Sequence, residues 1–391
     1  MRSPTGHSPE TIASRSRPIA WSTNDVRVTA RMTLQDIHSL DVYASVPRME
    51  YRRLGTGGLT ISAIAYGTWL THTPDAADLA RECVAAALDE GITTFDTADV
   101  YGSPEYGSAE RLLGAALSGV RRASVEILTK VCLPTGPGPN DRGLSRKHIV
   151  ESCNASLRNL GTDYIDLYQA HRYDENTPLE ETMTAFADLV RQGKVLYLGV
   201  SEWSPAQIEA AAVYAAELKV PLISNQPQYS LLWRVIEKEV VPTCTRLGIG
   251  QIVFSPVAQG VLTGKYRSGG RPPAESRATQ SRGSRFVGRY LGDPVLAAVQ
   301  RLRPIADELG LSLSQLAIAW VLQNPGVSAA VIGASRPAQL RENAAAAGRT
   351  LDQDVLDRID AALVDEVHGD LAERDPSKIA TPFDVMPAWK S

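Results

Sequence analysis

Short apolar runs and longer amphipathic stretches alternate along most of this chain. The apolar runs hold four to six residues, are rich in Ile, Val and Leu, and are bounded by turn residues. Continuous runs of this kind are typical of strands that a parallel sheet buries on both faces. We therefore predict eight strands, over residues 63–66, 93–96, 125–129, 164–168, 195–200, 222–225, 252–255 and 328–332.

The stretches between these runs carry apolar residues at helical spacing. They predict helices over residues 76–90, 109–117, 146–159, 179–192, 205–218 and 236–247. Ser204 followed by Pro205 is a typical helix start, and a glycine follows several of the other helices where a C-terminal glycine is favoured. Eight strands with intervening helices over roughly 300 residues predict a (β/α)8 barrel, the TIM-barrel fold.

The competing α/β architecture is a doubly wound dinucleotide-binding fold. It should carry a GxGxxG fingerprint directly after its first strand. Here the first strand leads into Gly67-Thr68-Trp69, and the fingerprint occurs nowhere in the sequence, which favours the barrel. Residues 50–62, EYRRLGTGGLTIS, predict a β-hairpin that turns on Gly57-Gly58 and could plug the bottom of the barrel.

Residues 1–48 differ from the rest of the chain. They are rich in Ser, Thr and Arg and poor in large apolar residues, a composition that predicts a disordered leader. They lack the apolar core of a secretory signal, although an organelle transit peptide is compatible with them. Because Met49 immediately precedes the first strand-like segment, a start placed too far upstream is a further interpretation. We place the barrel domain at residues 49–391.

Composition narrows the possible partners. The 391 residues carry a net charge of −4, which gives no reason to expect nucleic acid or an acidic membrane as a partner. No apolar stretch reaches the roughly 18 residues that a membrane span needs. The four cysteines are far apart and lack CxxC spacing, so we interpret them as reduced thiols of a cytoplasmic protein, not as disulfides or a zinc site.

Four polar residues stand where predicted strands give way to loops. Asp96 closes the second strand, Tyr101 follows it by five residues, Lys130 closes the third strand and His171 follows the fourth. In a barrel these positions meet at the C-terminal ends of the strands, where active sites lie. Each residue alone has an ordinary structural explanation, but their joint placement favours a site. His171 has no His or Cys at ligand spacing, so no metal site is predicted.

This combination suits proton transfer to an oxygen. An ammonium close to Tyr101 should lower the pKa of the phenol, which is ordinarily about 10. Asp96 would pair with Lys130, and His171 could donate a hydrogen bond to a substrate oxygen. Reduction of a carbonyl by hydride transfer needs such a proton donor, and it requires a nicotinamide cofactor.

The motifs that contain these residues resemble those of the aldo-keto reductases. They include GTW at 67–69, FDTADVYG at 95–102, LTK at 128–130, RGLSRKHIVES at 142–152, LGVSEWS at 198–204 and FSPVAQGVLTGKY at 254–266. The resemblance runs from residue 49 to about 20 residues before the end, and it implies extra C-terminal helices. It is strongest with the branch that includes bacterial reductases and the β subunits of voltage-gated potassium channels.

The resemblance also implies roles for the four residues. Tyr101 would be the general acid, Lys130 would tune it, Asp96 would support Lys130, and His171 would orient the carbonyl. Channel β subunits carry Asn where this chain has His171, which favours a working reductase. Two alternatives stay open: a cofactor-sensing regulatory subunit with slow or no turnover, and a barrel isomerase or lyase without a redox step.

By resemblance, the cofactor is NADPH or NADP+. The residues expected to bind it are Gly67, Thr68, Trp69, Asp96, Ser201, Gln226, Phe254, Ser255, Pro256, Val257, Ala258, Gln259, Gly260, Lys265, Arg277, Gly333, Ser335, Gln339, Glu342 and Asn343. Phe254 would stack on the nicotinamide, although a core phenylalanine is the rival interpretation. Gln226 would hydrogen-bond the carboxamide, and no contact is assigned to Glu202.

The segment 265–290 is rich in arginine and glycine. Such a segment is commonly a solvated mobile loop, whereas the resemblance implies a loop that folds over the cofactor pyrophosphate. Lys265 and Arg277 match phosphate-binding positions, and Ser335 suits a phosphate near a helix N-terminus. Gln339, Glu342 and Asn343 resemble adenosine-binding residues. Cations near the ribose favour NADPH over NADH.

The substrate pocket is predicted from aromatic residues. Trp69, Tyr101, His171 and Trp203 are expected to line it, together with the loop 133–140. Aromatic walls imply an apolar or aromatic aldehyde or ketone as the small-molecule substrate. The sequence does not identify the natural substrate or the direction in the cell, and the related branch makes a homo-oligomer possible.

Overall fold

The structure is a computed structural model that describes residues 49–102, 105–274, 276–280 and 283–363. The predicted leader, residues 1–48, lies outside the described residues. Within the unit that contains the described residues, eight parallel strands close a barrel in the order β10-β3-β4-β5-β6-β7-β8-β9. This confirms the predicted (β/α)8 barrel.

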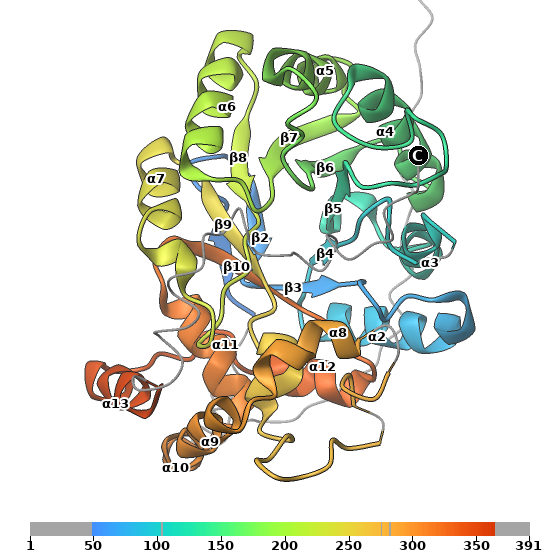
Figure 1. The fold of residues 1–391 in the computed structure, drawn as a ribbon. Helices are drawn as coiled ribbons and strands as arrows, with labels where there is room; N and C mark the ends of the chain where they lie inside the picture. The colour runs from blue at the N-terminus through green and yellow to red at the C-terminus, as the bar shows by residue number, and fades with distance from the viewer. Residues whose placement is uncertain (1–48, 103–104, 275, 281–282, 364–391) are drawn as a thin grey trace, which may run out of the picture. The chain divides into compact units, whose positions relative to one another are not determined.

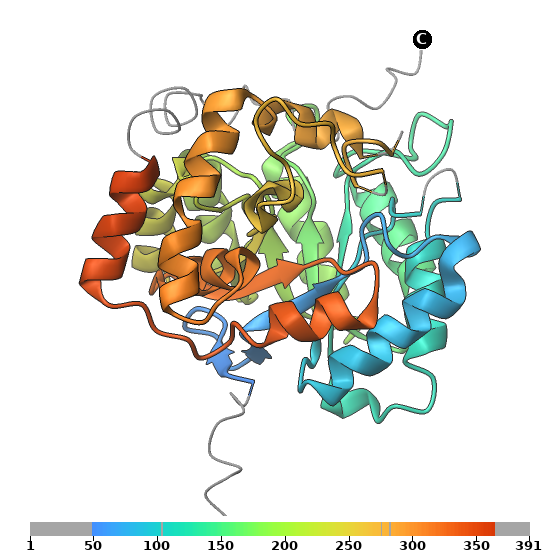
Figure 2. The same ribbon diagram turned by 90° about the horizontal axis from the view of Figure 1, so that it is seen from below.

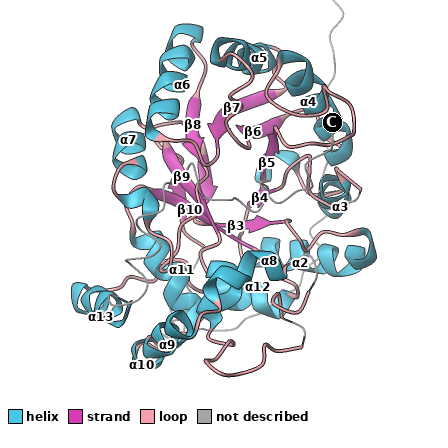
Figure 3. Cartoon of the chain, in the orientation of Figure 1, coloured by secondary structure: helices cyan, strands magenta, loops and turns pink. Residues whose placement is uncertain are grey.

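Each predicted strand is present in the barrel (Figures 1 and 3). Their bounds are β3 Ile64–Gly67, β4 Thr94–Asp96, β5 Glu126–Val131, β6 Ile165–Ala170, β7 Val195–Val200, β8 Leu222–Asn225, β9 Gly250–Phe254 and β10 Val327–Ile332. β5 and β6 extend two residues beyond the prediction. Their apolar pattern ends early because polar side chains, Lys130 and Gln169, occupy the last inward-facing positions, where they lie side by side in the ladder.

Helices surround the strands (Figures 1 and 3). Those between consecutive strands are α2 Ala77–Asp89, α3 Ser108–Ala116, α4 Arg146–Leu160, α5 Leu179–Arg191, α6 Pro205–Leu218, α7 Val240–Leu247 and α11 Leu313–Gln323. Ser204 caps α6 through a capping box, as its sequence predicts. The helix predicted over 236–247 begins instead at Val240, because Pro242 lacks an N–H and is tolerated only in the first turn.

Further helices follow the last barrel strands. α8 Ser284–Val287, α9 Asp293–Arg301 and α10 Arg303–Glu308 lie between β9 and α11, and α12 Pro337–Ala344 and α13 Gln353–Leu363 follow β10. Short 3₁₀ turns are η2 Pro74–Ala76, η3 Arg122–Ser124, η4 Val235–Glu237, η5 Ala258–Thr263 and η6 Gly288–Tyr290. Of the described helices, none alone is long and apolar enough to cross a membrane, and one pair bent by 88° passes that test jointly.

The predicted hairpin is present and closes one end of the barrel. β1 Tyr51–Arg53 pairs antiparallel with β2 Thr60–Ser62, and the turn includes Gly57-Gly58. Gly55 has a φ of +58°, and a Cβ there would lie 2.2 Å from the Gly248 carbonyl oxygen, so this position requires glycine. Because Gly248 lies two residues before the start of β9, the hairpin lies at the N-terminal ends of the strands. In Figure 2 it is the blue pair of strands at one end of the barrel.

The barrel interior changes from apolar to polar along its axis. Near the hairpin, Leu54 and Ile61 pack against the inward-facing Leu128 and Leu167 in one buried cluster. Successive inward positions on a strand are two residues apart, so Lys130 stands one layer above Leu128. The polar layer therefore lies at the C-terminal ends of the strands, and this is where the fold places the site.

Candidate active site

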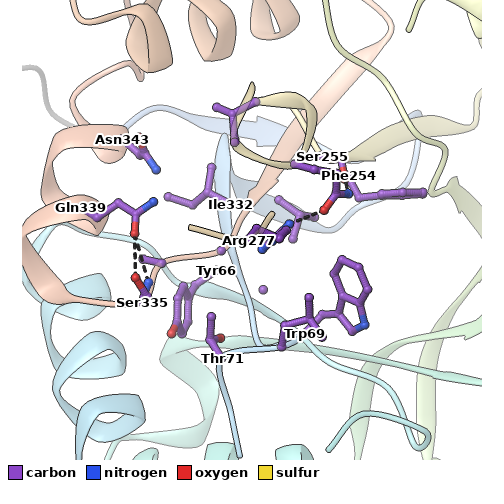
Figure 4. A pocket seen from close by; sticks show the side chains of 18 of the residues that line it. Tyr66, Trp69, Thr71, Phe254, Ser255, Arg277, Ile332, Ser335, Gln339 and Asn343 are labelled. Atoms are coloured by element: carbon purple, nitrogen blue, oxygen red, sulfur yellow. Dashed lines mark hydrogen bonds between the residues drawn. The ribbon is translucent and has the colours of Figure 1, made fainter. Parts of the chain in front are cut away.

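A cavity of about 700 Å³ opens at the C-terminal ends of the strands. It extends from Tyr101 and His171 at one end to Gln339 and Asn343 of α12 at the other. Figure 4 shows side chains of its lining from several strand ends and from α12. Asp96, Tyr101 and His171 all contribute to the lining, so the structure brings these predicted residues together.

Lys130 lies behind the cavity wall in a buried ion pair with Asp96. Its side chain is fully buried, and its Nζ donates to both carboxylate oxygens of Asp96, at 2.8 and 2.7 Å, and to the Thr97 carbonyl at 2.7 Å. Three acceptors match the three donors of an ammonium. Burial lowers the pKa of Lys130, and the contact with Asp96 opposes that effect. Gln226 donates to the same carboxylate at 2.8 Å, so the pair is held from β8 as well.

Tyr101 lies against this pair. The Lys130 Nζ is 5.1 Å from the centre of the Tyr101 ring. Burial and the Asp96 carboxylate raise the pKa of Tyr101 well above its ordinary value, while Arg172 lowers it. The expected lowering of the Tyr101 pKa by Lys130 is therefore not found, because the charge of Lys130 is balanced by Asp96. The phenol stays protonated at neutral pH, as a proton donor must.

His171 stands beside Tyr101. Its backbone N–H donates to the Val131 carbonyl at 2.8 Å, and its ring meets the Tyr101 ring edge-on at 5.8 Å between centres. Burial, followed by Arg172 and Lys130, lowers the pKa of His171 well below its ordinary value. The imidazole is thus neutral at neutral pH, and one of its two ring nitrogens carries a hydrogen.

Most of the residues predicted to bind the cofactor line this cavity. They are Gly67, Trp69, Asp96, Ser201, Gln226, Phe254, Ser255, Pro256, Val257, Gln259, Gly260, Lys265, Arg277, Gly333, Ser335, Gln339, Glu342 and Asn343. Thr68 and Ala258, both fully buried, are not among the described residues that line the cavity. Thr68 shares a hydrogen bond of 2.9 Å with the Thr97 hydroxyl.

The substrate end differs from the prediction. Trp69 lines the cavity, but Trp203 is buried and packs edge-on against Tyr173 at 4.8 Å between ring centres. Trp203 and the loop 133–140 are not among the described residues that line the cavity. Trp203 is therefore a core residue beside the site, and one of the expected aromatic walls is missing.

Three cations lie close to one another in the cavity lining. Lys265, Arg277 and Arg336 all line it. Burial lowers the pKa of Lys265, and Arg277 and Arg336 lower it further, so these charges lie close enough to repel one another. An anionic group between them would relieve this repulsion. The backbone N–H and the hydroxyl of Ser335 both hydrogen-bond the Gln339 side chain at 3.1 and 3.3 Å (Figure 4).

The arginine-rich segment 265–290 packs in part against the barrel. Arg277 donates to the Gln259 side chain, and its guanidinium lies 5.6 Å from the Trp69 ring (Figure 4). Phe286 of α8 also contacts Trp69, with 4.9 Å between ring centres. Aromatic and cation–π contacts of this kind offset the free-energy cost of ordering the segment. The segment is therefore not only the solvated loop that its composition suggests.

Several lining residues were not predicted from the sequence. Arg336 directly precedes α12, and Tyr66 lies on β3. Arg172 lines the cavity next to His171 in the sequence. Its position directly after a predicted site residue was the signal that could have identified it. For Tyr66, inside an apolar run, no comparable signal exists.

Comparison with known proteins agrees with this geometry. The profile of the Aldo/keto reductase family matches residues 63–364. The chain is 42% identical over 324 residues to a probable voltage-gated potassium channel subunit beta of Arabidopsis thaliana. The aligned residues make up 81% of this chain and 97% of that protein. It is 38% identical over 328 residues to the L-glyceraldehyde 3-phosphate reductase of Escherichia coli (strain K12). These residues make up 81% of this chain and 93% of that reductase.

The chain belongs to the aldo/keto reductase family. Membership supports an oxidoreductase that acts on carbonyl compounds, and the predicted branch is confirmed by the names of these relatives. A putative voltage-gated potassium channel subunit beta of Schizosaccharomyces pombe is similarly close, at 40% identity over 325 residues, 80% of this chain and 93% of that protein.

Buried histidines around the site predict a loss of stability in acid. His72 is 1% exposed, its ring lies 5.6 Å from that of Tyr66, and burial lowers its pKa to about 4. Below pH 6.5 the unfolded chain binds a proton that the folded chain excludes, so stability is full above pH 6.5 and falls toward pH 4. At about 1.4 kcal/mol per pH unit, His72 alone contributes about 3 kcal/mol to this fall.

Urea unfolding at pH 7.5 and pH 4.5 measures this effect. The wild-type free energy of unfolding should fall between the two, and His72→Gln should show a smaller fall. The same fall in both proteins would contradict the assignment to His72. Comparing the difference between pH values, and not the absolute stability, cancels any constant cost of the substitution.

Proposed function

We propose that this protein reduces an aldehyde or ketone to an alcohol with NADPH. The observation that carries the proposal is the placement of a protonated phenol and a neutral imidazole side by side at one end of a long cavity. Tyr101 and His171 form that end, and the Lys130–Asp96 pair supports them from behind. The same cavity also carries cations suited to phosphate groups.

Each side chain has a distinct part in this reaction. When bound, NADPH supplies a hydride to the carbonyl carbon. Tyr101 donates the phenol proton to the carbonyl oxygen, which gains negative charge as the hydride arrives. The His171 N–H holds that oxygen in place. Lys130 and Arg172 are the cations within reach of the tyrosinate that forms, until solvent returns the proton.

The cavity walls fit a dinucleotide. Phe254 closes β9 and lines the cavity, where its ring can stack on nicotinamide. Because the Gln226 Nε2 donates to Asp96, we assign its Oε1 atom to the carboxamide. Lys265, Arg277 and Arg336 would hold the phosphates, with Lys265 and Arg336 assigned to the phosphate that NADH lacks, and α12 would hold the adenosine. We favour NADPH over NADH because of this group of cations, since the extra phosphate of NADPH needs a further cation to bind it.

A regulatory role is the second candidate. It is favoured by the relatives that are named as potassium channel subunits. A regulator would bind NADPH tightly and turn over no carbonyl compound. A cytoplasmic location and a homo-oligomer remain predictions that the described residues leave open.

Replacing the phenol tests the chemistry. Tyr101→Phe should lower kcat by about 100-fold or more, since general acid catalysis commonly contributes that much. NADPH affinity should change by less than about threefold, because no cofactor contact is assigned to Tyr101. The assay follows NADPH absorbance with a panel of aldehydes, and nicotinamide fluorescence gives the affinity.

Tyr51→Phe is the matched control, since Tyr51 is 49% exposed at the opposite end of the barrel. It should retain wild-type turnover. Tight NADPH binding without turnover of any carbonyl by the wild-type protein would reject the reductase in favour of the regulator.

Removing two cations tests the cofactor preference. The double variant Lys265→Gln with Arg336→Gln should bind NADPH about tenfold more weakly, the order expected when a charge-assisted hydrogen bond is lost. Binding of NADH should change less, because it lacks the extra phosphate. The control pair is Lys147→Gln with Arg349→Gln, both exposed and outside the described lining. Equal weakening of both cofactors would contradict the assignment of these cations to the extra phosphate.

A further inference from the structure

We propose that Arg172 makes this site selective for small carbonyl compounds that carry an anionic group, a phosphate or a carboxylate, close to the reacting carbonyl. This inference rests on the proposed reductase function and adds the class of substrate. It differs from the expectation drawn from the sequence, which was an apolar or aromatic aldehyde or ketone.

Arg172 is fixed at the substrate end of the cavity. It directly follows His171 at the end of β6 and lines the cavity together with Tyr101 and His171. Its Nη1 donates to the His171 carbonyl at 2.5 Å and to the Ser201 hydroxyl at 3.2 Å. Ser201 in turn donates to the Gln226 carbonyl at 2.8 Å. The guanidinium is therefore anchored between the ends of β6, β7 and β8, and its position is defined before any substrate enters.

The charge of Arg172 reaches the reacting groups. Arg172 lowers the pKa of Tyr101, of His171 and of Lys130, which places its positive charge within electrostatic range of all three. A carbonyl oxygen held between Tyr101 and His171 would thus lie near a guanidinium. An anionic group a few bonds away from that oxygen can then meet the guanidinium fork, which matches phosphate and carboxylate geometry.

The carboxylate close to Arg172 is that of Glu202, and Arg289 lies close to it as well. Glu202 is half-buried, has a φ of +58°, and accepts a hydrogen bond from the Gln228 backbone N–H. Burial raises the pKa of Glu202, and Arg172 and Arg289 both oppose that rise, so two guanidiniums lie near this one carboxylate. Arg289 also donates to the Gln228 side chain at 3.0 Å. Glu202 thus has two arginines as neighbours, and Arg172 belongs at the same time to the cavity lining.

A purely structural role for Arg172 is the competing interpretation. In that role, the contacts with the His171 carbonyl and Ser201 would only brace the strand ends. Such a brace would not need to line the cavity, and a neutral donor could supply the same two hydrogen bonds. The relative named L-glyceraldehyde 3-phosphate reductase acts, by its name, on a small aldehyde that carries a phosphate. That is the chemistry that a guanidinium beside the carbonyl site would recognise.

Matched pairs of substrates test the proposal. We would measure kcat/KM with NADPH for glyceraldehyde 3-phosphate against glyceraldehyde, and for succinic semialdehyde against butanal. The wild-type protein should favour the anionic member of at least one pair by about tenfold or more, as expected for a charge-assisted contact. The phosphate and carboxylate pairs identify which anion the site takes, and a preference in either pair supports the proposal.

Variants of Arg172 link the preference to this side chain. Arg172→Gln should lower the ratio of anionic to neutral kcat/KM by about tenfold, mainly through KM for the anionic substrate. A general loss of activity affects both members of a pair and cancels in the ratio. Arg172→Lys keeps the charge and loses the fork, so its ratio should fall between those of the wild type and Arg172→Gln. Arg349→Gln, an exposed arginine outside the described lining, should keep the wild-type ratio.

The outcomes separate the inference from the function on which it rests. If the wild type reduces both members of each pair equally well, or if Arg172→Gln leaves the ratio unchanged, the inference is wrong and the reductase stands. If no carbonyl compound is reduced by the wild type, the proposed function itself fails. Should Arg172→Gln not fold, Arg172→Lys decides, because an unchanged ratio in that variant would overturn the role of the fork.

Discussion

A buried ion pair between Lys130 and Asp96 is the interaction on which the site depends. Removing an ammonium and a carboxylate from water costs several kcal/mol for each ion, and only good geometry with full hydrogen bonding offsets the cost. Here the three protons of Lys130 reach two oxygens of Asp96 and the Thr97 carbonyl. This geometry depends on the register of β4 and β5, in which Asp96 pairs with Leu128, two residues before Lys130.

The pair also organises its neighbours. Gln226 joins β8 to the Asp96 carboxylate, and Tyr101 lies over the Lys130 ammonium. Asp96 balances the charge of Lys130. The effect of burial on Tyr101 therefore outweighs the effect of the ammonium, and the pKa of Tyr101 rises. Arg172 supplies the opposing positive charge. The site thus holds a protonated phenol between the Lys130–Asp96 ion pair and the Arg172 guanidinium.

The sequence predicted the barrel because its strands are buried on both faces and therefore appear as continuous apolar runs. It predicted less where the fold departs from periodicity. The ends of β5 and β6 were missed because Lys130 and Gln169 are polar yet face inward. The four helices α8, α9, α10 and α11 between β9 and β10 were not predicted. No local signal showed that Trp203 turns into the core against Tyr173.

For the site, the four residues at strand ends could be predicted because parallel strands in a barrel bring their C-terminal ends together. Electrostatic detail could not be predicted in this way. The direction of the Tyr101 pKa depends on burial and on which partner takes the charge of Lys130, and both are properties of the packed structure. The same holds for Arg172, whose importance follows from lining the cavity and not from its sequence position alone.

A double-mutant cycle on the ion pair tests the central claim most directly. The free energy of unfolding in urea would be measured for the wild type, Asp96→Asn, Lys130→Met and the double variant. Each single substitution leaves a buried charge without its partner and should cost about 3 kcal/mol or more. The double variant should cost clearly less than the sum, with a coupling energy of at least about 1 kcal/mol. Strictly additive costs would contradict the account, because they would show that the two charges do not support each other in the folded protein.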